Sequence, residues 1–145
     1  DAQSVDPDLD VVTMAVKVPE TLAHLHYWSV QLTREASRDE VLDAFRTSSR
    51  IALIRISDGL SAINSVKELM ADLGRPHDSL YEVALWEDML KVQGNELFYA
   101  YMVDNQAIVV PETIDAIRAL TGAEPDAETS IRDTNDSLGI GSLGL

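Results

Sequence analysis

Two of the three histidines of this chain, His24 and His26, lie one residue apart inside the apolar stretch TLAHLHYWSV (21–30). Side chains two residues apart in a β-strand point to the same face, so a strand here would place both imidazoles side by side. Imidazole titrates near neutral pH, and it both transfers protons and binds metals. The spacing therefore allows three interpretations.

The first interpretation is that both histidines are core or interface residues satisfied by hydrogen bonds. The second is a metal site, which would need His77 or a carboxylate as a further ligand. The third is acid–base catalysis by an imidazole held on a rigid strand among apolar neighbours. The spacing alone does not choose among them.

Other polar and aromatic residues carry weaker indications of chemistry. Lys17 lies in a predicted strand and could meet an anion, although a lysine at the rim of a sheet is the commoner case. Arg55 and Asp58, near a predicted strand end, are expected to form a structural ion pair. Trp28 and Trp86 are expected to be core or interface aromatics.

Two consecutive strands are predicted around the histidines. Alternating apolar residues predict a strand over 11–19, which ends at Pro19. The next strand spans 22–32, and its aromatic and β-branched content favours strand over helix. The histidine face of this second strand consists of Leu22, His24, His26, Trp28, Val30 and Leu32.

Helices are predicted to alternate with the remaining strands. Ser37 and Glu40 form a capping-box pattern that begins a helix over 37–47. The stretch 50–56 is a predicted strand, and glycine in QGN (93–95) predicts a hairpin between 81–92 and 95–103. Three further helices are expected over 60–73, 111–121 and 126–138.

The element order predicts an α+β fold, with a mixed or antiparallel sheet and helices packed on one face. Several strands adjoin directly, which argues against a doubly wound parallel sheet. GIGSLG (139–144) has no strand before it and no helix after it, so it is not a dinucleotide-binding loop. We therefore expect no Rossmann domain in this chain.

Composition excludes several kinds of site. The 145 residues include no cysteine, so disulfides, thiolate zinc sites and a cysteine nucleophile are absent from the chain itself. No apolar run reaches the roughly 20 residues of a membrane span. The chain opens with DAQSVDPDLD and no initiator methionine, so we expect a processed product or a piece of something longer.

The chain is strongly acidic, with 25 acidic and 11 basic residues and a net charge of −14. This charge would repel a phosphate backbone, so nucleic acid binding is not expected. Only three of the basic residues are lysine. A high-salt host would favour such a surface because salt screens the repulsion, and an ordinary acidic domain is the alternative.

Taken together, several stretches resemble the C-terminal half of the archaeal-type glyceraldehyde-3-phosphate dehydrogenases. Their order and spacing match the family without large gaps, from about residue 1 to residue 140. The stretches are DLDVVTMAVKVPETLAHLH, RIALIRISDGLSAINSVKELMADLGRPHDSLYEVALWED, GNELFYAYMV and VVPETIDAIRAL.

The resemblance implies a cytoplasmic homotetramer of glycolysis or gluconeogenesis. Such an enzyme oxidises glyceraldehyde 3-phosphate with NADP or NAD and inorganic phosphate, and it needs no metal. The family's catalytic histidine falls on His24, with His26 as the alternative. The side-chain amide that contacts the cofactor falls on Asn105, or on Gln106 if the register slips by one.

The nucleophilic cysteine, the cofactor-binding domain and a paired-histidine substrate segment of the family would precede residue 1. We therefore expect the chain alone to be inactive. Residues 1–110 would form the catalytic-domain portion, 111–138 helices that pack on the missing cofactor domain, and 139–145 a flexible tail. The alternative function is a stand-alone, non-catalytic binding or assembly module with the same fold.

Overall fold

The computed structural model describes residues 4–18, 22–141 and 143. Three short 3-10 turns, η2 (Ile56–Asp58), η3 (Pro76–Asp78) and η4 (Glu87–Met89), connect longer elements. The strands are β1 (Ala23–Gln31), β2 (Ile51–Ile54), β3 (Val83–Trp86), β4 (Lys91–Gln93) and β5 (Glu96–Asp104). The helices are α1 (Arg38–Arg46), α2 (Ile63–Asp72), α3 (Val109–Thr121) and α4 (Ala127–Leu138).

The strands form one mixed sheet in the order β1-β5-β3-β2, with β4 paired to β5 off this path. β5 is antiparallel to β1, β3 and β4, whereas β2 and β3 are parallel. Because parallel neighbours need a crossover, α2 connects β2 to β3. The predicted α+β class with a mixed sheet is confirmed.

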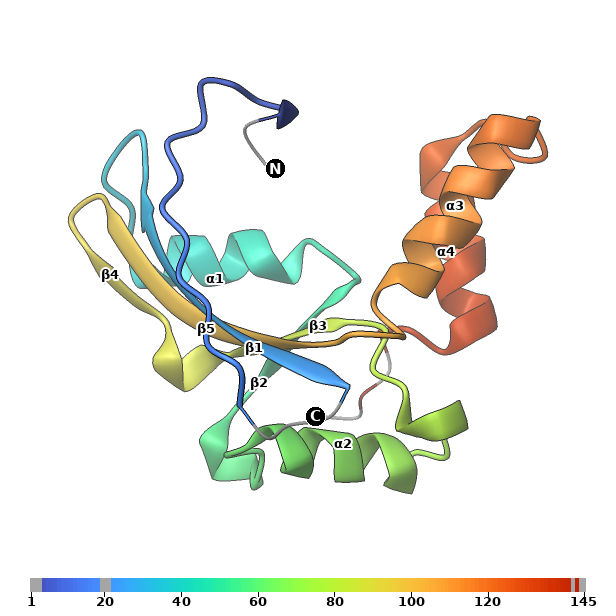
Figure 1. Cartoon of the computed structure of the whole chain (residues 1–145), viewed down its shortest axis with the longest axis horizontal. Helices are drawn as coiled ribbons and strands as arrows, with labels where there is room; N and C mark the ends of the chain where they lie inside the picture. Colours follow the sequence, from blue (N-terminus) through green and yellow to red (C-terminus); the bar gives the residue numbers. More distant parts are fainter. Residues whose placement is uncertain (1–3, 19–21, 142, 144–145) are drawn as a thin grey trace.

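The placement of the helices differs from the prediction, because they cover both faces of the sheet (Figure 1). On one face, Val66 and Met70 of α2 pack against Ile54, Trp86 and Met102. On the other face, residues of α1 pack against the opposite side chains of the same strands. That second cluster contains Val41, Leu42, Leu85, Leu90 and Leu97.

Two-sided packing follows from the strand sequences. In β3, Ala84 and Trp86 point to the α2 face, and Leu85 points to the α1 face, yet all three are at most 2% exposed. A strand that is apolar at successive positions needs cover on both faces. The continuous apolar run VALW is therefore the local signal that one layer of helices would not be enough.

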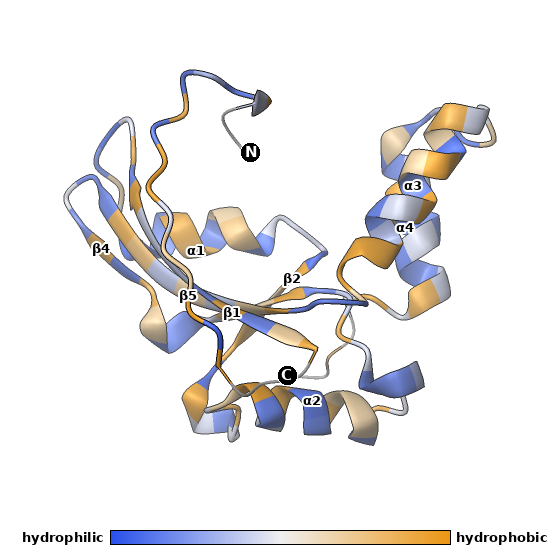
Figure 2. Ribbon diagram, in the orientation of Figure 1, coloured by the Kyte–Doolittle hydropathy of each residue, from blue (hydrophilic) through white to orange (hydrophobic). Residues whose placement is uncertain are grey.

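The predicted strand over 11–19 is wrong for the described residues 11–18, which form no strand (Figure 1). Figure 2 shows hydrophobic residues along this segment, but Val12, Met14 and Val16 are 91%, 97% and 84% exposed. A strand needs a neighbour to receive its backbone hydrogen bonds. No ladder partner for this segment exists in the part of the chain that the structure describes, and Pro19 lies outside it.

Most other predicted elements are confirmed, with changed boundaries. The Ser37 hydroxyl accepts a hydrogen bond from the Glu40 amide (3.2 Å) at the start of α1, as the capping-box pattern predicts. The long strand predicted over 81–92 is split into β3 and β4 by η4. α3 begins at Val109, two residues before the proline that was expected to start it.

α3 and α4 pack on each other and stand beside the sheet (Figure 1). Arg50, just before β2, holds this helix pair through Asn135 (3.0 Å), Asp115 and Glu112 (both 2.5 Å). Burial alone would raise the pKa of Asp115, but hydrogen bonds from Ser130, Thr134 and Arg50 lower it overall. An ionic cluster thus connects the helix pair to the sheet.

The chain after α4 returns to the sheet. Arg75 and Glu82 form a buried ion pair (2.6 Å), with side chains 7% and 1% exposed. Arg75 also donates to the Gly139 carbonyl (2.9 Å), and Glu82 accepts from the Gly141 amide (3.1 Å). Leu143 is buried in the cluster under α2. The predicted flexible tail therefore has contacts with the body at its described residues.

Candidate functional site

β1 carries both histidines on one face of the sheet, as their spacing predicts. The register pairs His24 with Val103 and His26 with Tyr101 on β5. The two imidazole ring centroids are 5.9 Å apart, and the planes are tilted by 55°. Leu85, Tyr101 and His26 form a row across three strands on the face that α1 also covers.

The two imidazoles have different surroundings. His26 is half-buried and stacks on Tyr101, with ring centroids 4.8 Å apart and planes within 8° of parallel. His24 is exposed. Neither imidazole has a hydrogen-bond partner among the residues that the structure describes. His24 is therefore the more exposed of the two unbonded imidazoles.

The pKa of His26 is lowered from its ordinary value of 6.5 by burial and by the neighbouring charge of His24. Burial disfavours the imidazolium, and a second positive charge nearby adds to that effect. A proton on His24 therefore makes a proton on His26 less favourable.

A metal site finds no support in the described part of the chain. No three His, Asp, Glu or Cys side chains there lie close enough to hold an ion. His77, the third candidate ligand, lies in the η3 loop and is exposed. Among the described residues, the paired histidines therefore have no third side chain close enough to complete a metal site.

Asn105 and Gln106 lie in the turn that connects β5 to α3, and both are exposed. Asn105 follows Val103 by two residues, and Val103 is the residue opposite His24. The backbone N–H of Asn105 donates to the backbone carbonyl of Leu22, just before β1 (2.8 Å). The fold thus brings the predicted amides and the predicted histidine to the same end of the β1–β5 pair.

The remaining candidates from the sequence lie in an ion pair, in the core or on the surface. Arg55 and Asp58 form the expected ion pair (3.0 Å). Trp86 is in the core, and its indole N–H donates to the Leu60 carbonyl (2.6 Å). Trp28 is 39% exposed on β1, and Lys17 is exposed in the segment before it.

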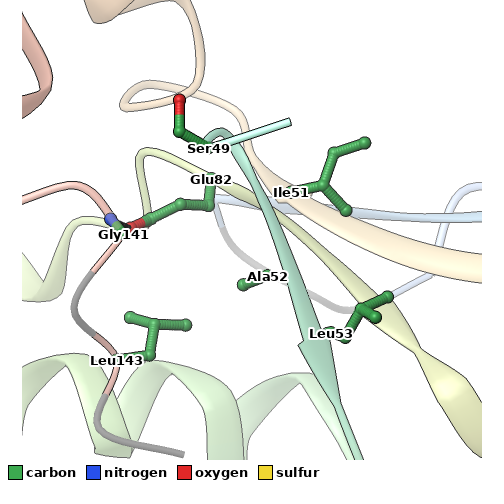
Figure 3. Close-up of a pocket in the computed structure, with 7 residues that line it drawn as sticks. All are labelled: Ser49, Ile51, Ala52, Leu53, Glu82, Gly141 and Leu143. Carbon is green, nitrogen blue, oxygen red and sulfur yellow. Dashed lines mark hydrogen bonds between the residues drawn. The ribbon is translucent and has the colours of Figure 1, made fainter. Parts of the chain in front are cut away.

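A cavity of about 210 Å³ lies at the opposite edge of the sheet, along β2 (Figure 3). Among its described lining residues, Glu82 alone is ionisable; it is paired with Arg75 and points at Gly141. The cavity includes neither histidine and neither predicted amide, so we do not assign it to the site. Its lining residues are Ser49, Ile51, Ala52, Leu53, Glu82, Gly141 and Leu143.

Sequence reasoning missed the contacts that support these candidates. The alternation predicts Tyr101, which stacks on His26, only as a residue of the strand over 95–103, and no pattern predicts the Lys67–Asp104 pair (2.6 Å). One signal existed: Lys67 shares the apolar helical spacing of Ile63, Val66 and Met70. A lysine on that face needs a buried partner, but the pattern does not say which.

No protein-family model matches the chain. The chain is 43% identical over 140 residues to a glyceraldehyde-3-phosphate dehydrogenase of Methanopyrus kandleri, covering 97% of this chain and 40% of the relative. A protein of the same name from Pyrobaculum calidifontis is 43% identical over 144 residues, covering 99% and 42%. The Haloarcula marismortui protein of that name is 39% identical over 141 residues, covering 97% and 40%.

These similarities, together with the α+β fold, place the chain among catalytic domains of dehydrogenases. It belongs to the archaeal glyceraldehyde-3-phosphate dehydrogenase family and spans about 40% of the length of the curated relatives that it matches. The resemblance recognised from the sequence is therefore confirmed. Within the described residues, no helix is both long enough and apolar enough to cross a membrane.

Proposed function

We propose that this chain forms the C-terminal, catalytic-domain part of a phosphorylating glyceraldehyde-3-phosphate dehydrogenase, with His24 as the acid–base residue. The observation that carries the proposal is the exposed His24 imidazole beside the half-buried His26, in a chain related to proteins of that name. The reaction oxidises the aldehyde to an acyl phosphate, with NADP or NAD as oxidant and inorganic phosphate as co-substrate.

Within this proposal, the nucleophile comes from outside the chain, which contains no cysteine. His24 takes the proton of the cysteine thiol, the thiolate attacks the aldehyde carbon, and the His24 imidazolium protonates the resulting alkoxide. Neutral His24 then accepts the hydroxyl proton back as the hydride leaves that carbon. The nicotinamide cofactor supplies the hydride acceptor when it is bound. A phosphate oxygen then attacks the thioester carbon, and the thiolate leaves.

His26 and the two amides have supporting roles in this proposal. The stacked ring of Tyr101 fixes His26, which in turn limits the orientations of His24. An exposed amide of Asn105 or Gln106 suits a nicotinamide cofactor because it offers both a hydrogen-bond donor and an acceptor. No metal is required for any step.

The proposal extends to the rest of the protein. Ile117 and Leu120 of α3 are 55% and 87% exposed, which supports a helix pair that packs on a cofactor-binding domain. Val12, Met14 and Val16 are exposed in the same way. We include in the proposal a cytoplasmic homotetramer, the state that the family resemblance implies.

The test compares the full-length protein that carries this chain with the 145-residue chain alone. We expect the full-length protein to reduce NADP or NAD only when both glyceraldehyde 3-phosphate and phosphate are present, and the chain alone to show no reduction. A full-length protein without this activity would favour the alternative of a non-catalytic assembly module. Activity of the chain alone would contradict the proposal that the nucleophile comes from outside this chain.

A further inference from the structure

The described residues include three non-glycine positions with positive φ. They are Leu22 (63°), His77 (56°) and Asp78 (55°). Positive φ is uncommon for non-glycine residues, and strained backbone persists only where its surroundings enforce it. The Leu22 carbonyl accepts from the backbone N–H of Asn105. The Asp78 carbonyl accepts from the Lys67 ammonium group, which also donates to Asp104. Two of these positions, Leu22 and Asp78, are therefore linked to the turn that begins at Asp104, Leu22 directly and Asp78 through Lys67.

Asp104 holds this turn with both carboxylate oxygens. Its Oδ1 accepts from the backbone amides of Gln106 (2.9 Å) and Ala107 (3.0 Å). Its Oδ2 accepts from Lys67 Nζ (2.6 Å). The Asp104 side chain is only 4% exposed. The backbone of Asn105–Ala107 is thus fixed from inside the protein, while the side chains of Asn105 and Gln106 face solvent.

Lys67 reaches Asp104 from α2, and its ammonium group also donates to the Asp78 carbonyl (2.6 Å). Burial on its own would raise the pKa of Asp104, but Lys67 and the Ala107 and Gln106 amides lower it overall. The carboxylate is therefore charged at neutral pH.

A buried ion pair is a weak source of stability, because removing two charges from water offsets most of their attraction. Packing alone does not account for this pair, since an apolar residue would suit the α2 face at position 67. The hydrogen bonds of Lys67 explain why a lysine stands at this position. Through one ammonium group it connects α2, the η3 loop and the turn after β5.

We propose that Asp104, oriented by Lys67, is a positioning residue for the nicotinamide cofactor. It fixes the turn so that the exposed amide of Asn105 or Gln106 meets the cofactor in one orientation. The inference rests on the proposed function, because it presumes that this amide contacts the cofactor. A displacement of about 1 Å in a positioning element costs up to roughly a hundredfold in rate.

The test is steady-state kinetics of the full-length enzyme carrying Asp104→Asn, Lys67→Met or Lys67→Arg. We expect the first two variants to raise the KM for NADP or NAD by about ten- to a hundredfold. The KM for glyceraldehyde 3-phosphate should stay within about twofold, because His24 is untouched. Lys67→Arg keeps the charge and should restore most of the cofactor affinity.

Glu82→Gln is the matched control, because it breaks a different buried ion pair. It should lower the melting temperature without changing the cofactor KM, which separates positioning from general loss of stability. An active enzyme in which Asp104→Asn and Lys67→Met both keep the wild-type cofactor KM would overturn this inference alone. A wild-type enzyme without activity would overturn the proposed function and this inference with it.

Discussion

His24 and His26 share a strand face, but they have different surroundings. His24 is exposed, whereas His26 is half-buried against the Tyr101 ring. An exposed imidazole can exchange protons with a substrate, and a stacked one is better suited to hold its neighbour in place. This difference gives a physical reason to prefer His24 as the acid–base residue, in agreement with the assignment made from the family resemblance.

The lowered pKa of His26 predicts a pH dependence of stability. A histidine whose folded pKa lies below 6.5 binds protons more readily in the unfolded chain. The free energy of unfolding should therefore fall as the pH drops from about 6.5 toward the folded pKa, and level off below it. Urea unfolding of the 145-residue chain between pH 8 and pH 4.5 measures this slope.

His26→Gln should flatten that slope, because it removes the group whose pKa differs between the folded and unfolded chain. His77→Gln is the matched control, since His77 is exposed in the η3 loop, and this variant should keep the wild-type slope. Equal slopes for His26→Gln and the wild type would contradict the argument that burial and His24 perturb His26.

The sequence predicted part of the site at the level of single residues. His-x-His in a strand fixes the shared face by a two-residue period, so the placement of His24 and His26 could be predicted. Tyr101 on His26 and Lys67 on Asp104 could not, because these contacts join residues 75 and 37 positions apart. Local periodicity carries no information about which distant residues meet.

At the scale of elements, the buried Arg75–Glu82 pair connects the loop after α2, the start of β3 and the chain after α4. Glu82→Gln would leave the Arg75 guanidinium, only 7% exposed, without a counter-charge. We expect a loss of about 3 kcal/mol in the free energy of unfolding. Guanidinium denaturation of the 145-residue chain provides the measurement.

The matched control is Asp58→Asn, which breaks the exposed Arg55–Asp58 pair. Exposed ion pairs contribute little, so this variant should lose less than about 1 kcal/mol. If Glu82→Gln and Asp58→Asn lose the same free energy, the buried pair is not what anchors the C-terminal segment to the sheet.

A helix start that neighbouring residues determine was predictable, and a strand that needs a ladder partner was not. The Ser37 hydroxyl accepts from the Glu40 backbone amide, so four consecutive residues (37–40) determine where α1 begins. The segment 11–18 has an equally regular alternation but no ladder partner among the described residues. Alternation shows which face a strand would bury, and pairing requires a neighbour that the pattern does not supply.

At the scale of the whole molecule, the charge of −14 predicts sensitivity to salt. Like charges on one small surface repel each other, and salt screens them within about 3 Å at 1 M. We expect the melting temperature of the 145-residue chain to rise from low salt to molar KCl. A melting temperature that stays flat or falls over this range would contradict the hypothesis of adaptation to a high-salt host.

The measurement that tests the central claim most directly is the turnover of the full-length enzyme with His24→Ala and, separately, His26→Ala. We expect His24→Ala to lower turnover by about 10²–10⁴-fold, the usual contribution of a positioned acid–base group. It should also slow alkylation of the catalytic cysteine by iodoacetamide at neutral pH, because the imidazole assists thiol ionisation. His26→Ala should reduce turnover much less and mainly lower stability. The reverse pattern would assign the role to His26, and unchanged turnover in both variants would contradict catalysis by this strand.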